Sequence, residues 1–239
     1  MGTDKKKSLF SIYLPAVITA VLIGIGFLIF TVMTVTYDVD AIGPEGSSVG
    51  FSKLNAAVRD AVGTNAAAEK ISDILGYLAI AVMACFFALG VYRLIKGRSF
   101  RAVDREIYAV GGFYAVLLAV YLLFEKLELN YRPVLGEEGL EASYPSSHTV
   151  LALCVFLSAG LSYGLFFGER NRIAGIAVKA AAAVCAVATV VFRFVSGVHW
   201  ATDIAGGILL SAFLLSVYSP VRSYVVSLPE KTGEKEKKE

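Results

Sequence analysis

The sequence predicts an all-α protein, a bundle of six transmembrane helices. Of its 239 residues, 56% are hydrophobic and 18% are charged, whereas soluble domains have roughly 45–50% apolar and about 25% charged residues. The mean hydropathy of +0.67 agrees with this contrast. The apolar residues also gather in long runs. A run that crosses lipid has to be helical, because its backbone N–H and C=O groups must pair within the segment.

In a helix, about 20 mainly apolar residues cross a hydrocarbon core about 30 Å thick. The runs that reach or approach this length are Leu9 to Val35, Ile71 to Leu94, Ile107 to Phe124, Thr149 to Phe167, Ile173 to Phe192 and Ile204 to Val226. The first run is too long for a signal-peptide h-region and is interpreted as a membrane anchor. The sequence therefore predicts one membrane domain over residues 9–226, between an N-terminal segment, 1–8, and a disordered, mixed-charge tail, 227–239.

The few charges are unevenly distributed. The 22 Lys and Arg residues against 20 Asp and Glu exclude a strongly basic nucleic-acid-binding protein and an acidic disordered chain. With six spans, fifteen basic residues fall on the side of the termini and six on the other, and Lys179 lies within the fifth run, where we expect it to snorkel. Because cytoplasmic loops carry an excess of basic residues, we predict cytoplasmic termini and external loops at about 36–70, 125–148 and 193–203.

The longest external loop, 36–70, contains a further helical pattern. Phe51, Leu54, Val58 and Val62 recur every three or four residues, which predicts an amphipathic helix at the outer membrane surface. Two roles stay open for it, packing against the bundle or forming a lid that faces lipid.

Residues suited to chemistry collect in three clusters on the predicted external side. The clusters are KLELNYRP at 126–133, YPSSHT at 144–149 and RFVSGVHWATD at 193–203. They hold three of the six external basic residues, Lys126, Arg132 and Arg193, and both histidines, His148 and His199. A charged side chain near the end of a membrane helix costs free energy unless it reaches water or an oppositely charged partner. This collection therefore predicts a site for a multiply charged anion, and phosphate suits Arg and Lys donors.

Helical spacing places His199 and Asp203 one turn apart on the same face of the sixth helix. The carboxylate can hold one ring nitrogen and leave the other free as a nucleophile or base. His148 lies at the start of the fourth helix, where unpaired backbone N–H groups favour an anion. Two histidines can therefore divide the work, one attacking phosphorus and the other protonating the departing oxygen.

Each of these features also has a plainer interpretation. The YPSS sequence can be a helix N-cap, His199 can anchor the chain at the membrane interface, and Arg193 can be a flanking charge. A zinc site made of His148, His199 and Asp203 is a further alternative, although three neighbouring cations would repel a metal ion. The plain interpretations require that all three clusters fall on one side by coincidence.

The three clusters resemble the motifs of the type 2 phosphatidic acid phosphatase (PAP2) family, metal-independent lipid phosphatases whose site is similar to that of vanadium-dependent haloperoxidases. The family pattern is K-x6-R-P, then P-S-G-H, then S-R-x5-H-x3-D. The matching residues are Lys126, Arg132 and Pro133, then Pro145, Ser146 and His148, then Arg193, His199 and Asp203. The resemblance covers the third to sixth helices and implies a six-helix bundle with a phosphatase core of this type.

Three positions depart from the pattern. Five residues, not six, separate Lys126 from Arg132, Ser147 replaces the glycine of the second motif, and Phe192 replaces the serine of the third. These departures shift the lysine, add a side chain next to a backbone N–H expected to meet phosphate, and remove a hydroxyl. None of them deletes an ionisable catalytic group.

The resemblance also implies roles for the residues. His199, oriented by Asp203, attacks phosphorus and forms a phosphohistidine, while His148 protonates the leaving group and then activates water. The phosphoryl oxygens are held by Lys126, Arg132, Ser146 and Arg193, with backbone N–H groups near Ser147 and His148. No metal or other cofactor is implied.

The sequence thus predicts a membrane phosphatase for a lipid phosphate or diphosphate: phosphatidate, phosphatidylglycerol phosphate, or undecaprenyl or another polyprenyl diphosphate. A phosphotransferase and a non-catalytic transporter of anionic lipids stay as alternatives. The cores of helices three to six hold chiefly Ala, Val, Leu, Ile and Phe, rather than the polar residues that a transporter needs. Short, sparsely basic loops suggest a bacterial inner membrane, and no protein partner is indicated.

Overall fold

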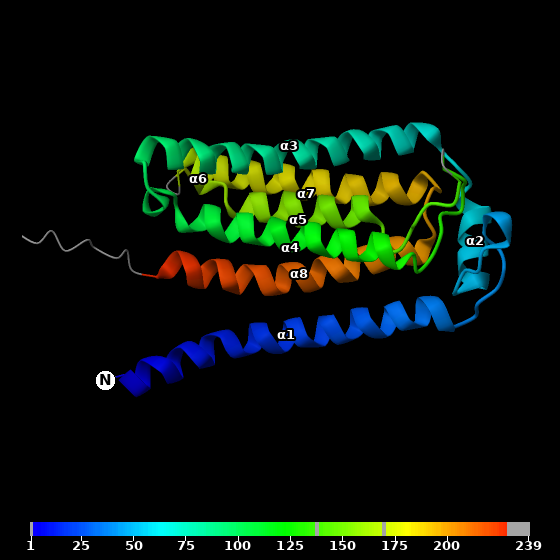
Figure 1. The fold of residues 1–239 in the computed structure, drawn as a ribbon, viewed down its shortest axis with the longest axis horizontal. Coiled ribbons are helices and arrows are strands. Elements are labelled where there is room, and N and C mark those ends of the chain that lie inside the picture. The colour runs from blue at the N-terminus through cyan, green and yellow to red at the C-terminus, as the bar shows by residue number, and fades with distance from the viewer. Residues whose placement is uncertain (1, 137–138, 169–170, 229–239) are drawn as a thin grey trace, which may run out of the picture.

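The computed structural model describes residues 2–136, 139–168 and 171–228, and within them the chain is helical apart from isolated β-bridges (Figure 1). The α-helices are α1 (Gly2–Thr36), α2 (Ser52–Val62), α3 (Ala66–Gly97), α4 (Arg105–Leu127), α5 (Ser147–Leu161), α6 (Gly164–Phe167), α7 (Arg172–Val195) and α8 (Ala201–Ser227). Two 3₁₀ turns, η1 (Pro44–Gly46) and η2 (Phe100–Ala102), lie in the loops. The predicted tail beyond residue 228 lies outside the described residues.

Five helices, α1, α3, α4, α7 and α8, are long and apolar enough to cross a membrane. The fourth predicted run, 149–167, is not one helix, because α5 stops before Ser162 and α6 follows as a separate turn. The N–H of Ser162 bonds back to the carbonyls of Ser158 and Ala159, which closes α5. At 1.5 Å per residue, α5 spans only about 22 Å. The all-helical fold is confirmed, and the count of six spans stays a prediction.

The helices lie roughly side by side, with α5 in contact with α3, α4, α7 and α8, and α1 packed along α8. Figure 1 shows the start of α1 and the end of α8 at one end of the bundle, and α2 at the other. The loop from α4 to α5 and the turn from α7 to α8 also lie at the α2 end. All three motif clusters are therefore at the same end, as the sequence predicts.

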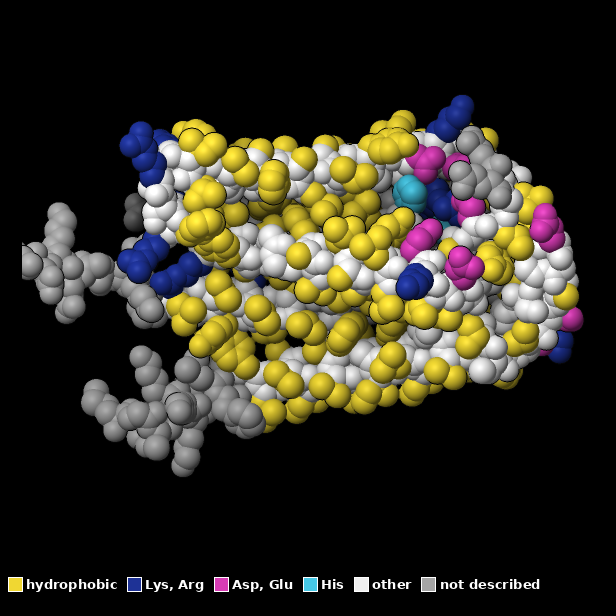
Figure 2. Space-filling view, viewed as in Figure 1, with side chains coloured by type: hydrophobic (Ala, Val, Ile, Leu, Met, Phe, Trp, Pro, Cys, Tyr) yellow, Lys and Arg dark blue, Asp and Glu magenta, His cyan; other side chains and the backbone are white. Residues whose placement is uncertain are grey.

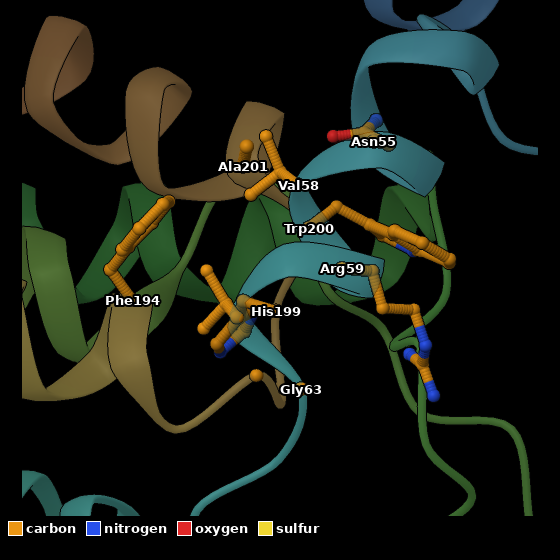
Figure 3. Close-up of a pocket in the computed structure, with 10 residues that line it drawn as sticks. Asn55, Val58, Arg59, Gly63, Phe194, His199, Trp200 and Ala201 are labelled. Atoms are coloured by element: carbon orange, nitrogen blue, oxygen red, sulfur yellow. The ribbon is translucent and has the colours of Figure 1, made fainter.

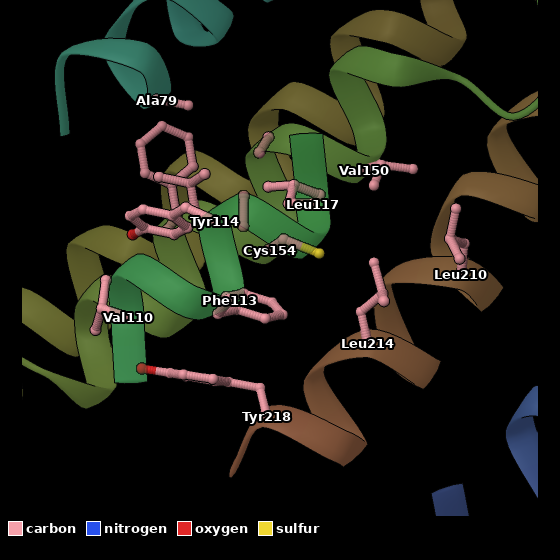
Figure 4. Packing of buried hydrophobic residues seen from close by; sticks show 14 of the residues in the cluster. Ala79, Val110, Phe113, Tyr114, Leu117, Val150, Cys154, Leu210, Leu214 and Tyr218 are labelled. Atoms are coloured by element: carbon pink, nitrogen blue, oxygen red, sulfur yellow. The ribbon is translucent and has the colours of Figure 1, made fainter. Parts of the chain in front are cut away.

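The core lies where α4, α5 and α8 meet (Figure 4). The rings of Phe113 and Tyr218 stack with their centroids 4.3 Å apart. Ala79, Ala152 and Cys154 are fully buried, and such small side chains let helix backbones approach closely. In lipid this close packing, rather than the hydrophobic effect, holds helices together. The core therefore fixes the starts of α5 and α8, which carry the second and third motifs, relative to each other.

The loop at 36–70 contains the predicted helix, α2, and its place at the outer membrane surface stays a prediction. Its inward face carries Asn55, which is 1% exposed, while Leu54 on the other face is 53% exposed. The Asn55 amide donates to the Thr202 hydroxyl at 3.0 Å and accepts from the Thr202 backbone N–H at 3.3 Å. Of the two roles left open, the structure therefore shows packing, against the first turn of α8.

Candidate active site

The loop between α4 and α5 folds back on itself at the polar end of the bundle. The backbone N–H of Arg132 donates to the carbonyl of Glu141 at 3.0 Å, and that of Ser143 to the carbonyl of Asn130 at 2.9 Å. These two bonds hold the segment that leaves α4 beside the segment that enters α5. As a result, the side chains of Asn130 and Ser143 both reach one acceptor on α8, the carboxylate of Asp203.

The second motif packs directly onto α8. The backbone N–H of Ser146 donates to the carbonyl of Asp203 at 3.0 Å. The Tyr144 ring lies against Gly206, where an added Cβ would be only 2.4 Å from the ring. The Tyr144 hydroxyl is 2.8 Å from that of Thr31 on α1, and burial raises the pKa of Tyr144 to about 12. Glycine at 206 therefore permits the contact that joins the second and third motifs.

His199 is held through one ring nitrogen. Its Nδ1 lies 3.0 Å from the Ser143 hydroxyl and 3.5 Å from Oδ2 of Asp203. Asp203 is fully buried and also accepts from the backbone N–H of Trp200 at 2.9 Å and from the Asn130 amide at 3.1 Å. The other ring nitrogen, Nε2, is buried and has no hydrogen-bond partner among the described residues. Nε2 is therefore unpaired within the described part of the chain.

The pKa of His199 is held well below its usual value of 6.5. Burial is the largest cause, because it disfavours the charged imidazolium, and the positive charges of Arg193 and Arg132 add to it. The ring is therefore neutral at neutral pH. A neutral ring with a proton on Nδ1 has its lone pair on Nε2, the form that a nucleophile requires.

A carboxylate on α3 joins the second histidine to the buried arginine. Oδ1 of Asp73 lies 3.3 Å from Nε2 of His148 and 3.0 Å from Nη1 of Arg193. The Arg193 side chain is 2% exposed, and its Nη1 is also 3.4 Å from the Ser72 hydroxyl. Helix α3, for which the sequence predicted no role in the site, therefore brings together groups from the second and third motifs.

Gly76, one turn after Asp73, leaves space for the His148 ring, because it has no side chain. A Cβ at Gly76 would lie 2.8 Å from Cδ2 of His148 and 3.2 Å from its Nε2. We therefore expect Gly76→Ala to push the ring away from Asp73 and to lower kcat by roughly 10- to 100-fold, since small misplacements of reacting groups have effects of this size. Steady-state assays with lipid phosphates, the substrates that the sequence resemblance implies, measure this.

Gly26→Ala is the matched control, because Gly26 is also in a membrane helix and an added Cβ there meets nothing within 4 Å. We expect its kcat to equal that of the wild type. Equal activity of both variants would contradict the placement of His148.

A cleft of about 1170 Å³ begins at this cluster and continues along α3, α4 and α5. The charged and hydroxyl side chains that line its polar end are Glu69, Asp73, Glu125, Arg132, Ser143, Ser147, His148 and Arg193. Away from that end, apolar side chains such as Met83, Phe86 and Leu117 predominate, and the lining extends to Leu94 and Phe100. Figure 2 shows this face, with a hollow lined by hydrophobic side chains and a histidine among charged residues at one end. The cleft thus combines an ionic head site with a long apolar groove.

His199 lines a separate, small cavity of about 10 Å³ beneath α2 (Figure 3). Arg59 of α2 covers this region, with its guanidinium 5.5 Å from the Trp200 ring centroid. His199 is 7% exposed and, among the residues described, is not one that lines the large cleft. In this conformation α2 and the α7–α8 turn therefore enclose the imidazole.

The structure brings most, though not all, of the predicted phosphate-binding residues to the cleft. Arg132, Ser147 and Arg193 line it. Ser146 is fully buried, and its hydroxyl accepts from that of Thr149 at 3.1 Å. Lys126 is exposed at the end of α4 and is not among the described residues that line the cleft.

The residue of α4 that does line the cleft is Glu125. It lies seven positions before Arg132, where the family pattern K-x6-R-P has its lysine. The one-residue shift noted in the sequence thus turns the lysine to the surface and places a carboxylate at the head site.

Sequence reasoning missed Asp73, Asn130 and Ser143. Asp73 had a signal, since it is an ionisable residue inside a predicted span, and such residues mark functional sites. Asn130 and Ser143 had none, because their contact with Asp203 depends on how the loop folds back. In the described part of the chain, no group of three or more His, Cys, Asp or Glu side chains is placed to hold a metal ion.

Three comparisons connect this geometry to known proteins. Residues 121–226 match the model of the PAP2 superfamily. The bacitracin transport permease protein BcrC of Bacillus licheniformis is 29% identical over 188 residues, which cover 67% of this chain and 85% of that protein. The crystal structure of a transmembrane PAP2-type phosphatidylglycerolphosphate phosphatase from Bacillus subtilis matches the fold with a TM-score of 0.58 and 19% identity, covering 88% of this chain and 99% of that one.

Proposed function

With the resemblance to the PAP2 family confirmed by the match over residues 121–226, we propose that this chain is a metal-independent membrane phosphatase that hydrolyses lipid phosphates or diphosphates through a phosphohistidine. One observation carries the proposal. His199 is neutral, is held at Nδ1, and has a free Nε2 in the field of Arg193 and Arg132. A free imidazole nitrogen near two guanidinium groups is suited to attack an anionic phosphoryl group.

The proposed reaction has two steps. In the first, Nε2 of His199 forms a bond to phosphorus as the bond from phosphorus to the leaving oxygen breaks, and His148 in its imidazolium form gives that oxygen a proton. Burial and the charge of Arg193 lower the pKa of His148 to about 4 in this structure, so the negative charge of the bound phosphoryl group has to raise it before this step. In the second, His148 takes a proton from water as the water oxygen attacks phosphorus and the P–N bond breaks. Inorganic phosphate leaves and both histidines return to their starting states.

Arg132 and Arg193 are assigned to the phosphoryl oxygens, whose charge grows in the transition state. Arg193 is already paired with Asp73, which also contacts His148. Asp73 engages only Nη1, and Nε of Arg193 has no hydrogen-bond partner among the described residues, so a phosphoryl oxygen can bind Nε while the contact with Asp73 stays. We assign the backbone N–H groups at the start of α5, near Ser147 and His148, to the same oxygens. We assign no phosphate contact to Lys126 or to the Ser146 hydroxyl, because neither residue is among the described residues that line the cleft.

The length of the groove favours a polyprenyl diphosphate over a diacyl lipid. From Asp73 to Leu94 the α3 side of the cleft measures roughly 30 Å. This equals the full hydrocarbon thickness of about 30 Å, whereas the acyl chains of a bilayer lipid reach about half of it. A single chain longer than one leaflet fills such a groove, and undecaprenyl diphosphate has one.

The sidedness is proposed on the charge count. The sequence assigns fifteen of the basic residues to the side of the termini, and the start of α1 and the end of α8 lie at the end of the bundle opposite the site (Figure 1). The positive-inside rule then places the termini in the cytoplasm and the site at the outer face of a bacterial inner membrane. A lipid headgroup in the outer leaflet can enter the cleft directly from there.

The experiment that tests the function is phosphate release by the purified full-length protein. The panel consists of undecaprenyl diphosphate, a short-chain prenyl diphosphate, phosphatidate and phosphatidylglycerol phosphate, each with and without EDTA. We expect hydrolysis that EDTA leaves unchanged, with kcat/KM highest for the long prenyl chain, because each additional buried methylene contributes about 0.8 kcal/mol. Equal kcat/KM for the two prenyl chains would contradict the proposal that the groove binds the lipid chain. Inhibition by EDTA would contradict metal independence.

Transport is the second candidate, because the similar protein from Bacillus licheniformis is named a transport permease. The middle of the cleft is lined by apolar side chains such as Phe86 and Leu117, which offer no polar path. Analysis of the products separates the candidates: a phosphatase releases phosphate in detergent, a phosphotransferase yields a phosphorylated acceptor alcohol, and a transporter changes no bond.

A further inference from the structure

Asp203 contacts His199 through a third side chain. The direct separation from Nδ1 of His199 to Oδ2 of Asp203 is 3.5 Å, longer than the 2.7–3.2 Å typical of an N–H···O hydrogen bond. The hydroxyl of Ser143 lies between them, 3.0 Å from Nδ1 and in hydrogen-bond contact with Oδ2. Ser143 itself is 3% exposed, so water does not compete for these positions.

With Asp203 ionised, counting donors and acceptors fixes the direction of each bond. Oδ1 of Asp203 accepts from Asn130, and Oδ2 accepts from the Trp200 N–H and from Ser143. A serine hydroxyl has one hydrogen to donate. Because this hydrogen goes to Asp203, the oxygen can only accept from His199. Nδ1 must therefore carry the ring proton, and the lone pair is left on Nε2.

We propose that Ser143 is a positioning residue that transmits the orienting effect of Asp203 to His199. This inference rests on the proposed function and adds to it a residue outside the three motifs. Without the hydroxyl, Nδ1 has no acceptor at normal hydrogen-bond distance, and the ring is free to change tautomer or to rotate. The attacking nitrogen is then present for only part of the time, which lowers kcat rather than the affinity for the lipid.

The test is a double-mutant cycle on steady-state kcat and KM, with Ser143→Ala, Asp203→Asn and the double variant. We expect Ser143→Ala to lower kcat by about 10- to 100-fold, the range found when a residue that orients a functional side chain is lost. The double variant should be no slower than Asp203→Asn alone, because both changes break one chain of contacts. A wild-type kcat for Ser143→Ala, or effects that multiply in the double variant, would overturn the inference.

Two further variants keep the test sharp. Ser143→Cys fills the same space with a weakly bonding thiol, so we expect it to fold and to lose kcat as the alanine variant does, and a wild-type kcat would again overturn the inference. Ser211→Ala is the matched control, since Ser211 is 1% exposed, as buried as Ser143, and its hydroxyl donates to the carbonyl of Gly207 in its own helix. Its effect on kcat should be negligible and should multiply with that of Asp203→Asn.

The experiments distinguish a failure of the Ser143 inference from a failure of the proposed function. If His199→Ala is inactive and Ser143→Ala is fully active, the phosphatase assignment stands and the role of Ser143 is wrong. If His199→Ala is fully active, the assignment itself fails, whatever the serine variants show.

Discussion

His199→Ala is expected to abolish turnover, with a loss in kcat on the order of 10³-fold or more, because the variant has no group to form the covalent intermediate. The ring is enclosed by α2 and the α7–α8 turn, so the truncation leaves a small cavity and a modest loss of stability. Phosphate release from a lipid diphosphate measures turnover, and thermal unfolding in detergent shows that the variant folds.

Phe194→Ala is the control for this change. Phe194 lines the same small cavity and carries no titratable group, so its truncation perturbs the packing without removing a nucleophile. We expect this variant to keep most of its activity. If the two variants lost the same activity, the effect of His199 would be structural and the assignment of the nucleophile would be wrong.

Arg193→Ala is expected to have the next largest effect, a fall in kcat/KM of about 10²- to 10³-fold, because one charged donor to the developing phosphoryl charge is lost. The guanidinium is 2% exposed, and a buried charge of this kind is retained where it has a partner or a ligand. Inhibition by vanadate should weaken in parallel, since five-coordinate vanadate resembles the transition state. Activity assays and vanadate titrations check both.

Arg101→Ala is the matched control for the arginine variant. Arg101 is exposed at the other end of the bundle, in η2, so the same truncation there should leave kcat/KM and vanadate inhibition unchanged. A similar loss in both variants would mean that net charge, and not the contact of Arg193, controls activity.

The sequence predicted much of the fold because the signals for it are local. Length and composition of an apolar run predict a membrane helix without reference to its neighbours, and the 3.6-residue period predicted α2 in the same way. The end of α5 before Ser162 was not predicted, because the apolar side chains resume at residues 165–167 in α6 and the whole stretch was interpreted as one run. The contact that turns α2 toward the bundle, between Asn55 and Thr202, involves residues 147 positions apart and has no local signal.

The sequence also predicted part of the site, namely the residues that lie in the three motifs. The motifs predicted that His148, Arg193 and His199 come together, since helix ends on one side of a membrane can meet. The contribution of α3 was missed, because Asp73 reaches His148 and Arg193 only through the way that α3 packs against α5 and α7. The positions of Lys126 and Glu125 depended on the rotation of α4, which a motif spacing that is off by one residue does not determine.

The central claim, a phosphohistidine on His199, is tested most directly by trapping the intermediate. The purified full-length protein is mixed with a lipid diphosphate labelled at the terminal phosphate, quenched during turnover and digested, and the labelled peptide is mapped. We predict an acid-labile, alkali-stable label on the peptide that contains His199, and no such label in His199→Ala. Label on another residue, or label that persists in His199→Ala, would contradict the account.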